Sequence, residues 1–227
     1  MNKQLRILAA LLLPITLVGC ASSPAGPGVP HVFTPSGKGP FPAVIVLHTH
    51  GGLQQADIDA ARNLSAQGYV TVAADFHAKG GLDNIDKAYD FLSANPAVAP
   101  GRIGLLGFSQ GAAEAIKFAE YSHRFTERRI GAIVSYFLGP NPGNNAAELP
   151  PILFLQGSLD SHVSPARLKA YCDAQSKLGA HCELVRYEGT KHAFDRHTRN
   201  YQGYDQRAAA DAFARTTAFF GKYLKDL

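Results

Sequence analysis

The sequence predicts an α/β fold in which a mostly parallel central sheet carries helices on both faces. Two observations support this prediction. Continuous apolar runs rich in β-branched residues recur along the chain, and segments with helical spacing of apolar residues lie between them. Strands that alternate with helices are typical of a parallel sheet covered by helices. No composition break marks a second domain, so residues 31–227 are expected to form one domain.

Six apolar runs are the predicted strands. They show no alternation of apolar and polar residues, which indicates strands that are buried on both faces. The runs span residues 43–48, 69–74, 103–108, 130–136, 152–156 and 182–187. Five further segments have apolar residues at the spacing of an amphipathic helix. These predicted helices span residues 55–67, 84–94, 110–122, 165–178 and 207–224.

The composition is that of a globular protein, and it argues against several classes of function. Hydrophobic residues make up 46% of the chain and charged residues 18%, and the 22 glycines and 14 prolines follow no period. Fibrous and repeat architectures are therefore excluded. The formal net charge is +4, and leaving out Lys3 and Arg6 of the N-terminal segment leaves 20 basic against 18 acidic residues. A balance so mild and so evenly scattered does not suggest nucleic-acid binding.

Residues 1–19 are predicted to be a signal peptide. Basic residues precede an apolar stretch from Ile7 to Val18, which is shorter than the roughly 20 residues that a membrane-spanning helix needs. The stretch ends in Leu-Val-Gly followed by Cys20, and this pattern resembles the lipobox of bacterial lipoproteins. The resemblance implies cleavage before Cys20 and attachment of lipid to it. The alternative is an ordinary secretory signal in which Cys20 is incidental.

A lipid at Cys20 would make the membrane a partner of this protein. Residues 20–30 would then be the lipidated cysteine and a flexible tether, because residues 21–30 consist mainly of Ala, Ser, Pro and Gly. Ala21 follows the cysteine, which by the sorting pattern of such lipoproteins implies the outer membrane in a host with two membranes. We therefore expect an exported protein on the periplasmic face of that membrane.

The two remaining cysteines, Cys172 and Cys182, form a possible disulfide. An exported location permits the bond. Cys172 falls in a predicted helix and Cys182 opens the next predicted strand, so a tight helix-to-strand connection would bring them together. The alternative is two buried thiols. The chain has no Cys-x-x-Cys spacing of the metal-binding kind.

The motif Gly-Phe-Ser-Gln-Gly at residues 107–111 carries the first chemical prediction. It follows the strand at 103–108 and opens the helix at 110–122, and ligands of parallel sheets bind beyond the carboxyl ends of the strands. A sharp strand-to-helix turn there would project the Ser109 hydroxyl from the sheet as a nucleophile. The backbone N–H of Gln110 would face a developing oxyanion. The alternative is a serine that only caps the helix.

A serine nucleophile needs a base and an acid, and His192 and Asp160 are the candidates. His192 follows the last predicted strand and Asp160 follows the strand at 152–156. The order Ser109, Asp160, His192 is that of α/β-hydrolases. Asp75 precedes the serine, so a turn-forming role suits it better. The alternatives are a loop histidine at 192 and a turn residue at 160.

The loop His48-Thr49-His50-Gly51-Gly52 is expected to supply the second oxyanion donor. It follows the strand at 43–48 and resembles the HGG-type loop of esterases. The backbone N–H of Thr49 or of His50 would donate, and we favour Thr49. A different interpretation makes His48 and His50 zinc ligands. Zinc amidohydrolases are (β/α)₈ barrels, whereas this chain offers six predicted strands, so we expect no metal.

Four motifs together resemble the dienelactone hydrolase family. They are VLHTHGG, GFSQG, LQGSLDSHV and YEGTKHAFD, in that order, within residues 31–227. The resemblance implies an α/β-hydrolase fold with an eight-stranded type of sheet, a cofactor-free acyl hydrolase, and a triad at Ser109, Asp160 and His192. Founding members use a cysteine nucleophile and carry a carboxylate beside the oxyanion loop, and this chain differs at both places. A general carboxylesterase or lactone hydrolase is therefore favoured over a dienelactone hydrolase.

Three other functions stay open on the sequence alone. The same triad serves thioesterases and peptidases, a hydrolase fold can persist in a lipid-anchored protein that only binds, and the zinc hydrolase using His48 and His50 is the third. The favoured partner is a small-molecule ester or lactone. Arg196, Arg199 and Tyr201 follow His192, and we expect them in a solvated loop, with contact to an anionic substrate as the alternative.

Overall fold

The computed structural model describes residues 21–23, 31–125, 127–140, 148–197 and 203–226. The predicted signal peptide, Cys20 and residues 24–30 lie outside this part of the chain. The strands are β1 Ala21–Ser23, β2 His31–Thr34, β3 Phe41–Leu47, β4 Val70–Ala74, β5 Val98–Phe108, β6 Ala132–Tyr136, β7 Ile152–Gly157 and β8 Cys182–Tyr187. The helices are α1 Gln55–Ala66, α2 Asp83–Ala94, α3 Gln110–Phe125, α4 Pro165–Lys177 and α5 Gln206–Phe220, and a π-helical turn at Gly221–Lys225 follows α5.

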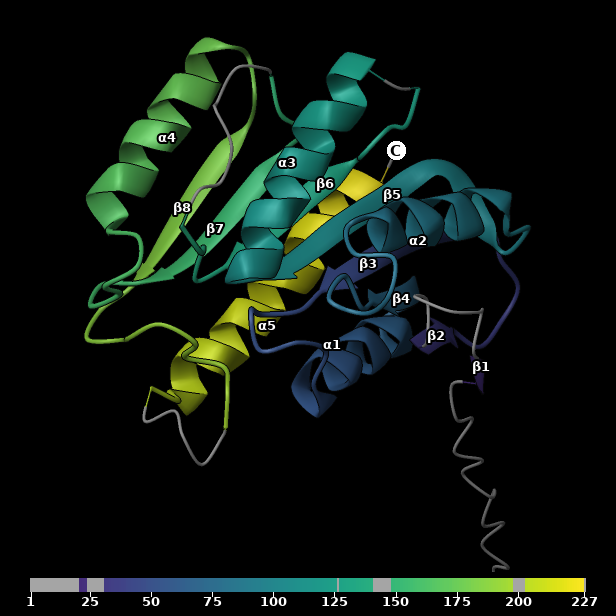
Figure 1. The fold of residues 1–227 in the computed structure, drawn as a ribbon, viewed down its shortest axis with the longest axis horizontal. Coiled ribbons are helices and arrows are strands. Elements are labelled where there is room, and N and C mark those ends of the chain that lie inside the picture. Colours follow the sequence, from purple (N-terminus) through teal and green to yellow (C-terminus); the bar gives the residue numbers. More distant parts are fainter. Residues whose placement is uncertain (1–20, 24–30, 126, 141–147, 198–202, 227) are drawn as a thin grey trace, which may run out of the picture.

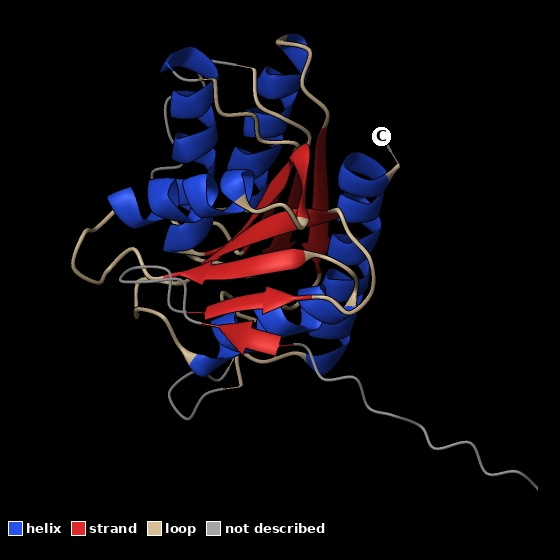
Figure 2. Ribbon diagram, turned by 90° about the vertical axis from the view of Figure 1, so that its right-hand side faces the viewer, coloured by secondary structure: helices blue, strands red, loops and turns tan. Residues whose placement is uncertain are grey.

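One eight-stranded sheet forms the centre of the molecule, in the order β1-β2-β4-β3-β5-β6-β7-β8 (Figure 1). The strands from β4 to β8 pair in parallel, and β2 pairs antiparallel with β1 and β4. The predicted α/β class is confirmed, with helices on both faces of the sheet (Figure 2). Each predicted strand and helix is present, with ends shifted by a few residues.

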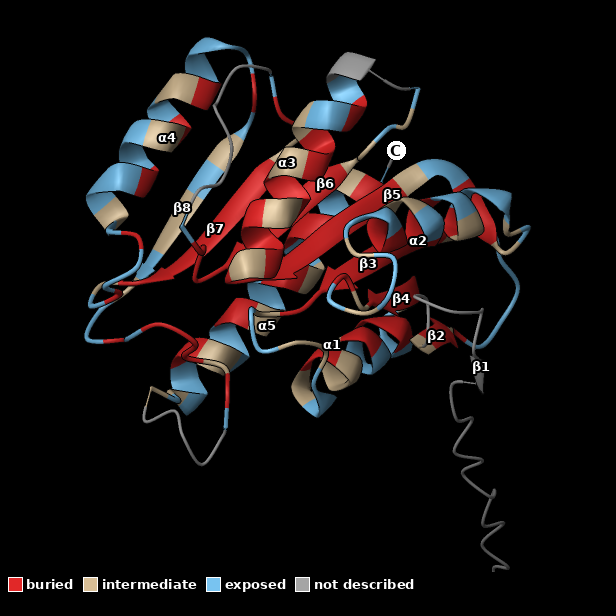
Figure 3. Cartoon of the chain, viewed as in Figure 1, coloured by how far each residue is buried: buried red, intermediate tan, exposed pale blue. Residues whose placement is uncertain are grey.

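Side chains of alternate residues in the central strands belong to two separate apolar cores, one on each face of the sheet. In β3, Ala43, Ile45 and Leu47 belong to the core that contains side chains of α2, α3 and α4, whereas Val44 and Val46 belong to the core that contains side chains of α1 and α5. Side chains of a strand point to opposite faces in turn, so a strand covered on both faces must be apolar throughout. Figure 3 shows buried central strands between helices whose outer faces are exposed, whereas β8 at the edge of the sheet is only partly buried. This explains why the central strands read as continuous apolar runs. The prediction of burial on both faces is wrong for residues 182–187, because β8 lies at the edge of the sheet.

Strands β1 and β2 are additions to the six that the sequence predicts. The four residues of β2 precede a turn and pair only at the antiparallel edge, so no long apolar run signals them. Ala21–Ser23 form β1, which pairs with β2. This differs from the flexible tether expected for these three residues, because the free edge of β2 offers backbone hydrogen bonds to an extended segment.

A disulfide joins Cys172 in α4 to Cys182 at the start of β8, with the Cα atoms 5.3 Å apart. The predicted pairing is confirmed.

Within the described ranges, no helix has the length and apolar character that crossing a membrane requires.

Candidate active site

Ser109 occupies a strained turn between β5 and α3. Its φ is +53°, in the left-handed region that costs a residue with a side chain of order 1–3 kcal/mol. The Ser109 amide donates to the carbonyl of Tyr136, and the Ser109 carbonyl accepts from the amide of Gly139. The turn is therefore fixed by the loop after β6 as well as by its own helix. This is the elbow geometry that the sequence predicts.

The glycines on either side of Ser109 allow the close packing of this turn. A Cβ at Gly107 would lie closer than 3.0 Å to the backbone of Ala112, and a Cβ at Gly111 would lie closer than 3.0 Å to the Leu47 and His48 carbonyls. Helix α3 thus approaches the end of β3 more closely than any side chain would permit.

The variant Gly111→Ala is expected to lower the free energy of unfolding by about 1–3 kcal/mol, because the clash is with backbone atoms that cannot rotate away. Urea unfolding followed by circular dichroism measures this difference. Gly221→Ala is the matched control, since a Cβ at that position would meet no atom within 4 Å and the φ of Gly221 is −55°. Equal losses in the two variants would contradict the packing argument.

The loop after β7 holds Asp160 with its carboxylate turned inward. The Asp160 Oδ1 accepts the amides of His162 at 2.8 Å and Val163 at 3.4 Å, and the side chain is fully buried. Buried Gln156 at the end of β7 donates to the Val163 carbonyl and accepts from the Leu138 amide, both at 2.9 Å. The acid loop is therefore anchored to the loop after β6, which also holds the serine turn.

His192 lies between the other two predicted residues and contacts both. Its Nδ1 is 2.7 Å from Asp160 Oδ2, and its Nε2 is 2.9 Å from Ser109 Oγ. An ionised carboxylate only accepts, so Nδ1 carries the hydrogen and Nε2 is free to accept from the serine hydroxyl. All three residues are buried. The structure thus brings together the three residues predicted for nucleophile, base and acid, in an arrangement that can activate a hydroxyl.

Backbone strain gathers around this arrangement. Within the described part of the chain, the non-glycine residues with positive φ are Ser109, Phe137 and Ala193. Ala193 follows the histidine, and the Phe137 ring packs edge-on against the His192 ring with centroids 5.1 Å apart. Strained backbone of this kind persists where the surroundings hold it, often at functional sites.

The two predicted oxyanion donors lie on the expected segments. Gln110 is the first residue of α3, so its amide has no acceptor within the helix. Thr49 is half-buried in the loop after β3, where its carbonyl accepts from the Gly52 amide at 3.2 Å and its hydroxyl from the Gly51 amide at 3.3 Å. These bonds shape the loop, and the donor role of the Thr49 amide stays a prediction.

The alternative prediction is a zinc site at His48 and His50. Among the described residues, no third side chain completes such a site. His48 is fully buried, stacked on the Phe76 ring at 3.9 Å, with its Nε2 3.2 Å from Asp75 Oδ1, whereas His50 is exposed. Burial lowers the pKa of His48. In the described ranges neither histidine belongs to a group of three side chains that could hold a metal ion. Asp75 also accepts the amides of two following residues, as a turn-forming aspartate does.

The environment of Arg196 differs from the one that the sequence predicts. The sequence places it in a solvated loop, but its side chain is only 4% exposed. Its guanidinium pairs with buried Asp57 at 2.9 Å and Asp195 at 3.1 Å and lies 4.1 Å above the Phe108 ring. Asp57 also accepts the Gln54 amide at the start of α1. The loop that contains His192 and Arg196 is thus joined to α1. No local pattern in the sequence could have revealed a partner 139 positions away.

The other two residues predicted for this loop, Arg199 and Tyr201, lie outside the described residues.

Asp195 gives this network a dependence on pH. Burial raises the pKa of Asp195 from 3.8 to about 6, although Arg196 opposes the shift. Between these values the unfolded chain has released the proton and the folded chain keeps it, so the free energy of unfolding falls as pH rises. The shift sets an upper limit of about 3 kcal/mol on this fall in the free energy of unfolding. The actual fall is smaller than this limit, because the Asp195 side chain is 18% exposed and solvent screens its charge.

Asp195→Asn should remove that slope. Urea unfolding of both proteins at several pH values from 4 to 7 tests this, since the difference between the two profiles isolates the one carboxyl group. Parallel profiles would contradict the assignment.

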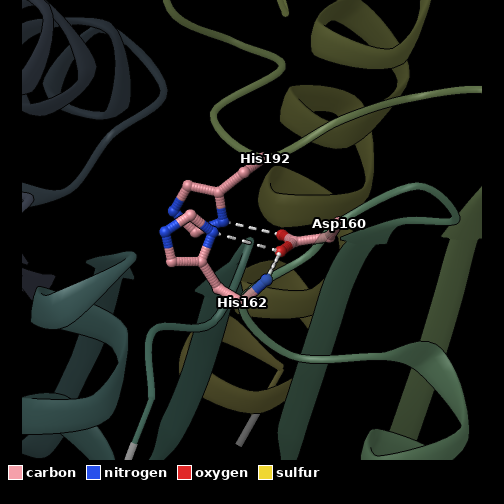
Figure 4. Close-up of side chains that lie close together, drawn as sticks. All are labelled: Asp160, His162 and His192. Carbon is pink, nitrogen blue, oxygen red and sulfur yellow. Dashed lines mark hydrogen bonds and ion pairs between the residues drawn. The ribbon is translucent and has the colours of Figure 1, made fainter.

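His162 belongs to the LQGSLDSHV motif, but the motif alone predicts no role for it. Its half-exposed ring stacks on the His192 ring with centroids 4.1 Å apart, and its Nδ1 is 3.6 Å from Asp160 Oδ1 (Figure 4). The spacing of two residues from Asp160 was the available signal, but only the fold shows that the ring turns back over His192.

This sheet with its Ser–His–Asp arrangement defines an α/β-hydrolase. The chain belongs to the dienelactone hydrolase family, whose sequence model matches residues 30–88 and 79–224. The resemblance found in the motifs is thereby confirmed. Membership of this family makes the chain a hydrolase that acts on esters or lactones.

Relatives and solved structures agree with this assignment. A protein of Methylorubrum extorquens assigned as a carboxymethylenebutenolidase is 24% identical over 219 residues, covering 83% of this chain and 75% of the relative. A dienelactone hydrolase-like promiscuous phosphotriesterase from metagenomic libraries has a TM-score of 0.74 at 22% identity, with 85% of this chain and 91% of that chain covered. A thermophilic esterase from Thermogutta terrifontis has a TM-score of 0.68 at 19% identity, with 94% and 96% covered. At these identities the structures support the fold alone.

Proposed function

We propose that the protein is a serine carboxylesterase or lactone hydrolase that cleaves small substrates through an acyl-enzyme. Ser109 is the nucleophile, His192 the general base and Asp160 the residue that orients His192. The observation that carries this proposal is the continuous chain of contacts from Asp160 Oδ2 through both nitrogens of His192 to Ser109 Oγ. A strained serine at the carboxyl end of β5 adds support.

The proposed reaction has two halves. In the first, Nε2 of His192 takes the hydroxyl proton as Ser109 Oγ attacks the ester carbonyl, and the resulting imidazolium protonates the leaving alcohol. In the second, water attacks the acyl-serine with His192 again as base, which releases the acid and restores the hydroxyl. The amides of Gln110 and Thr49 are proposed to hold the oxyanion in both halves. A lactone follows the same course, with its alcohol still tethered to the acyl group.

A comparison of substrate classes tests the proposal. Values of kcat/KM would be measured for matched acetate and butyrate esters, a five-membered lactone, a thioester and a peptide. We expect hydrolysis of the esters or the lactone to exceed that of the peptide. A preference for the thioester or the peptide would overturn the proposed substrate class, and hydrolysis of none of them would favour the non-catalytic binding protein.

We also propose that Cys20 anchors the enzyme to a membrane on the exported side, because residues 1–20 have the pattern of a lipoprotein signal. The disulfide between Cys172 and Cys182 suits an oxidising compartment. Metabolic labelling with an alkyne fatty acid should label the protein in a bacterial host, and Cys20→Ser should abolish the label. Equal labelling of both would contradict the anchor.

A further inference from the structure

His162 adds a third ligating side chain to the pair formed by Asp160 and His192. The nitrogen and oxygen atoms that these three residues offer lie within 4.8 Å of one another. Figure 4 shows both imidazole rings turned towards the same carboxylate. In the described ranges this is the one group of three His, Cys, Asp or Glu side chains with such spacing. The proposed hydrolysis makes no use of His162.

We propose that Asp160, His162 and His192 form a binding site for a divalent transition-metal ion of the zinc class, and that metal bound there switches the hydrolase off. The inference rests on the proposed function for its second half only. Two imidazoles and a carboxylate are a donor set that zinc accepts. The metal is therefore an inhibitor of this enzyme, distinct from the zinc cofactor considered at His48 and His50.

The distances suit such an ion if His192 Nδ1 and Asp160 Oδ2 move apart by about 0.7 Å and the His162 ring tilts. Ligand bonds of 2.0–2.2 Å in a tetrahedral site place two ligand atoms about 3.4 Å apart. The His192 Nδ1 and Asp160 Oδ2 atoms are 2.7 Å apart, and the His162 Nδ1 and Asp160 Oδ1 atoms are 3.6 Å apart. The stacked His162 ring must tilt to direct its nitrogen at the ion. Its side chain is 46% exposed, so the tilt needs no repacking of the core, and solvent can supply a fourth ligand.

Metal at this place would change which nitrogen of His192 bears the hydrogen. A metal bond to Nδ1 replaces the hydrogen bond to Asp160 Oδ2, and the neutral ring then carries its one hydrogen on Nε2. An Nε2–H group donates to Ser109 Oγ and cannot take the proton of the hydroxyl. Binding therefore removes the base without any net loss of a proton from His192. Removal of the metal restores the original tautomer, so the inhibition is reversible.

Direct binding tests the site without any need for turnover. Zn²⁺ would be titrated by calorimetry into the purified Ser109→Ala variant, and Co²⁺ into the same protein with its visible absorption spectrum recorded. We expect one ion per chain and a Co²⁺ spectrum of the intensity that four-coordinate sites give. Adding His162→Gln should weaken Zn²⁺ binding by at least about 10-fold, since it removes one of the three protein ligands. Adding His123→Gln is the matched control, because this exposed histidine lies near the far end of α3.

Inhibition tests the second half of the proposal. The Zn²⁺ concentration that halves ester hydrolysis would be measured relative to the metal-free rate of each protein, with a chelator added at the end. His162→Gln should raise that concentration by at least about 10-fold and His123→Gln should leave it unchanged. Equal binding and inhibition in both variants would overturn the site. Zn²⁺ binding that depends on His162 without hydrolysis of any ester would uphold the site and reject the proposed function.

Discussion

Replacing Ser109 with Ala is expected to lower kcat for ester hydrolysis by at least about 10⁴-fold. The hydroxyl that His192 contacts at 2.9 Å is then gone, and the site keeps only the background rate that oxyanion donors and substrate binding provide. The fold should survive, because within the described residues the Ser109 hydroxyl makes its hydrogen bond to His192. Steady-state kinetics with the preferred ester measures the effect, and thermal unfolding checks the fold.

Ser93→Ala is the matched control for this variant. Ser93 is an exposed serine in α2, away from the carboxyl end of β5. We expect it to retain the parent kcat. A Ser109→Ala protein with more than about one tenth of the parent activity would mean that another group is the nucleophile.

Asp160→Asn is expected to lower kcat by about 10⁴-fold, the second large effect. An amide in place of the carboxylate can donate to Nδ1 of His192, which favours the tautomer with its hydrogen on Nε2. That ring cannot accept the Ser109 proton. The fully buried position of the Asp160 side chain strengthens this dependence, because electrostatic interactions are stronger away from bulk solvent. The kinetics would be measured with the same ester.

Asp75→Asn separates the two acids that the sequence offers. Asp75 lies 3.2 Å from His48 and caps its own turn, so its loss should change kcat by less than about 10-fold. A result in which Asp75→Asn is the more damaging of the two variants would show that the acid has been assigned to the wrong residue.

The fold was predictable because its signals are local. A strand covered by helices on both faces is apolar at every position, as in β3, and such runs are visible in the sequence. The serine turn was predictable for a similar reason, since Gly107 and Gly111 are required within two residues of Ser109. The positions of His192 and Asp160 could be predicted because each residue follows an apolar run that is recognisable as a strand.

What the sequence could not reveal depends on contacts between distant segments. Arg196 can be buried because Asp57, at the start of α1, supplies a counter-charge. His162 acquires its place from the tight turn that starts at Asp160, whose Oδ1 accepts the His162 amide. Strand β2 depends on the free edge of β4, and β1 on the free edge of β2, more than on their own residues. In each case a partner far along the chain, or a turn geometry, decides the outcome.

The serine in this chain bears on what the enzyme hydrolyses. Members of the family that open dienelactones have a cysteine where this chain has Ser109, and a carboxylate beside the oxyanion loop. Here that loop offers His48, Thr49 and His50. A hydroxyl depends on its base more strongly than a thiol does, which is consistent with the short and buried contacts of His192. We therefore propose a general esterase or lactonase rather than a dienelactone hydrolase.

The most direct test of the central claim is the intact mass of the purified protein after reaction with a fluorophosphonate probe. An activated serine displaces fluoride from the probe and gains its phosphonyl group, whereas an ordinary surface serine does not react. We predict one adduct on the parent protein and on Ser93→Ala, and none on Ser109→Ala. No adduct on the parent protein, or an adduct that persists in Ser109→Ala, would contradict the assignment of Ser109 as a nucleophile activated by His192.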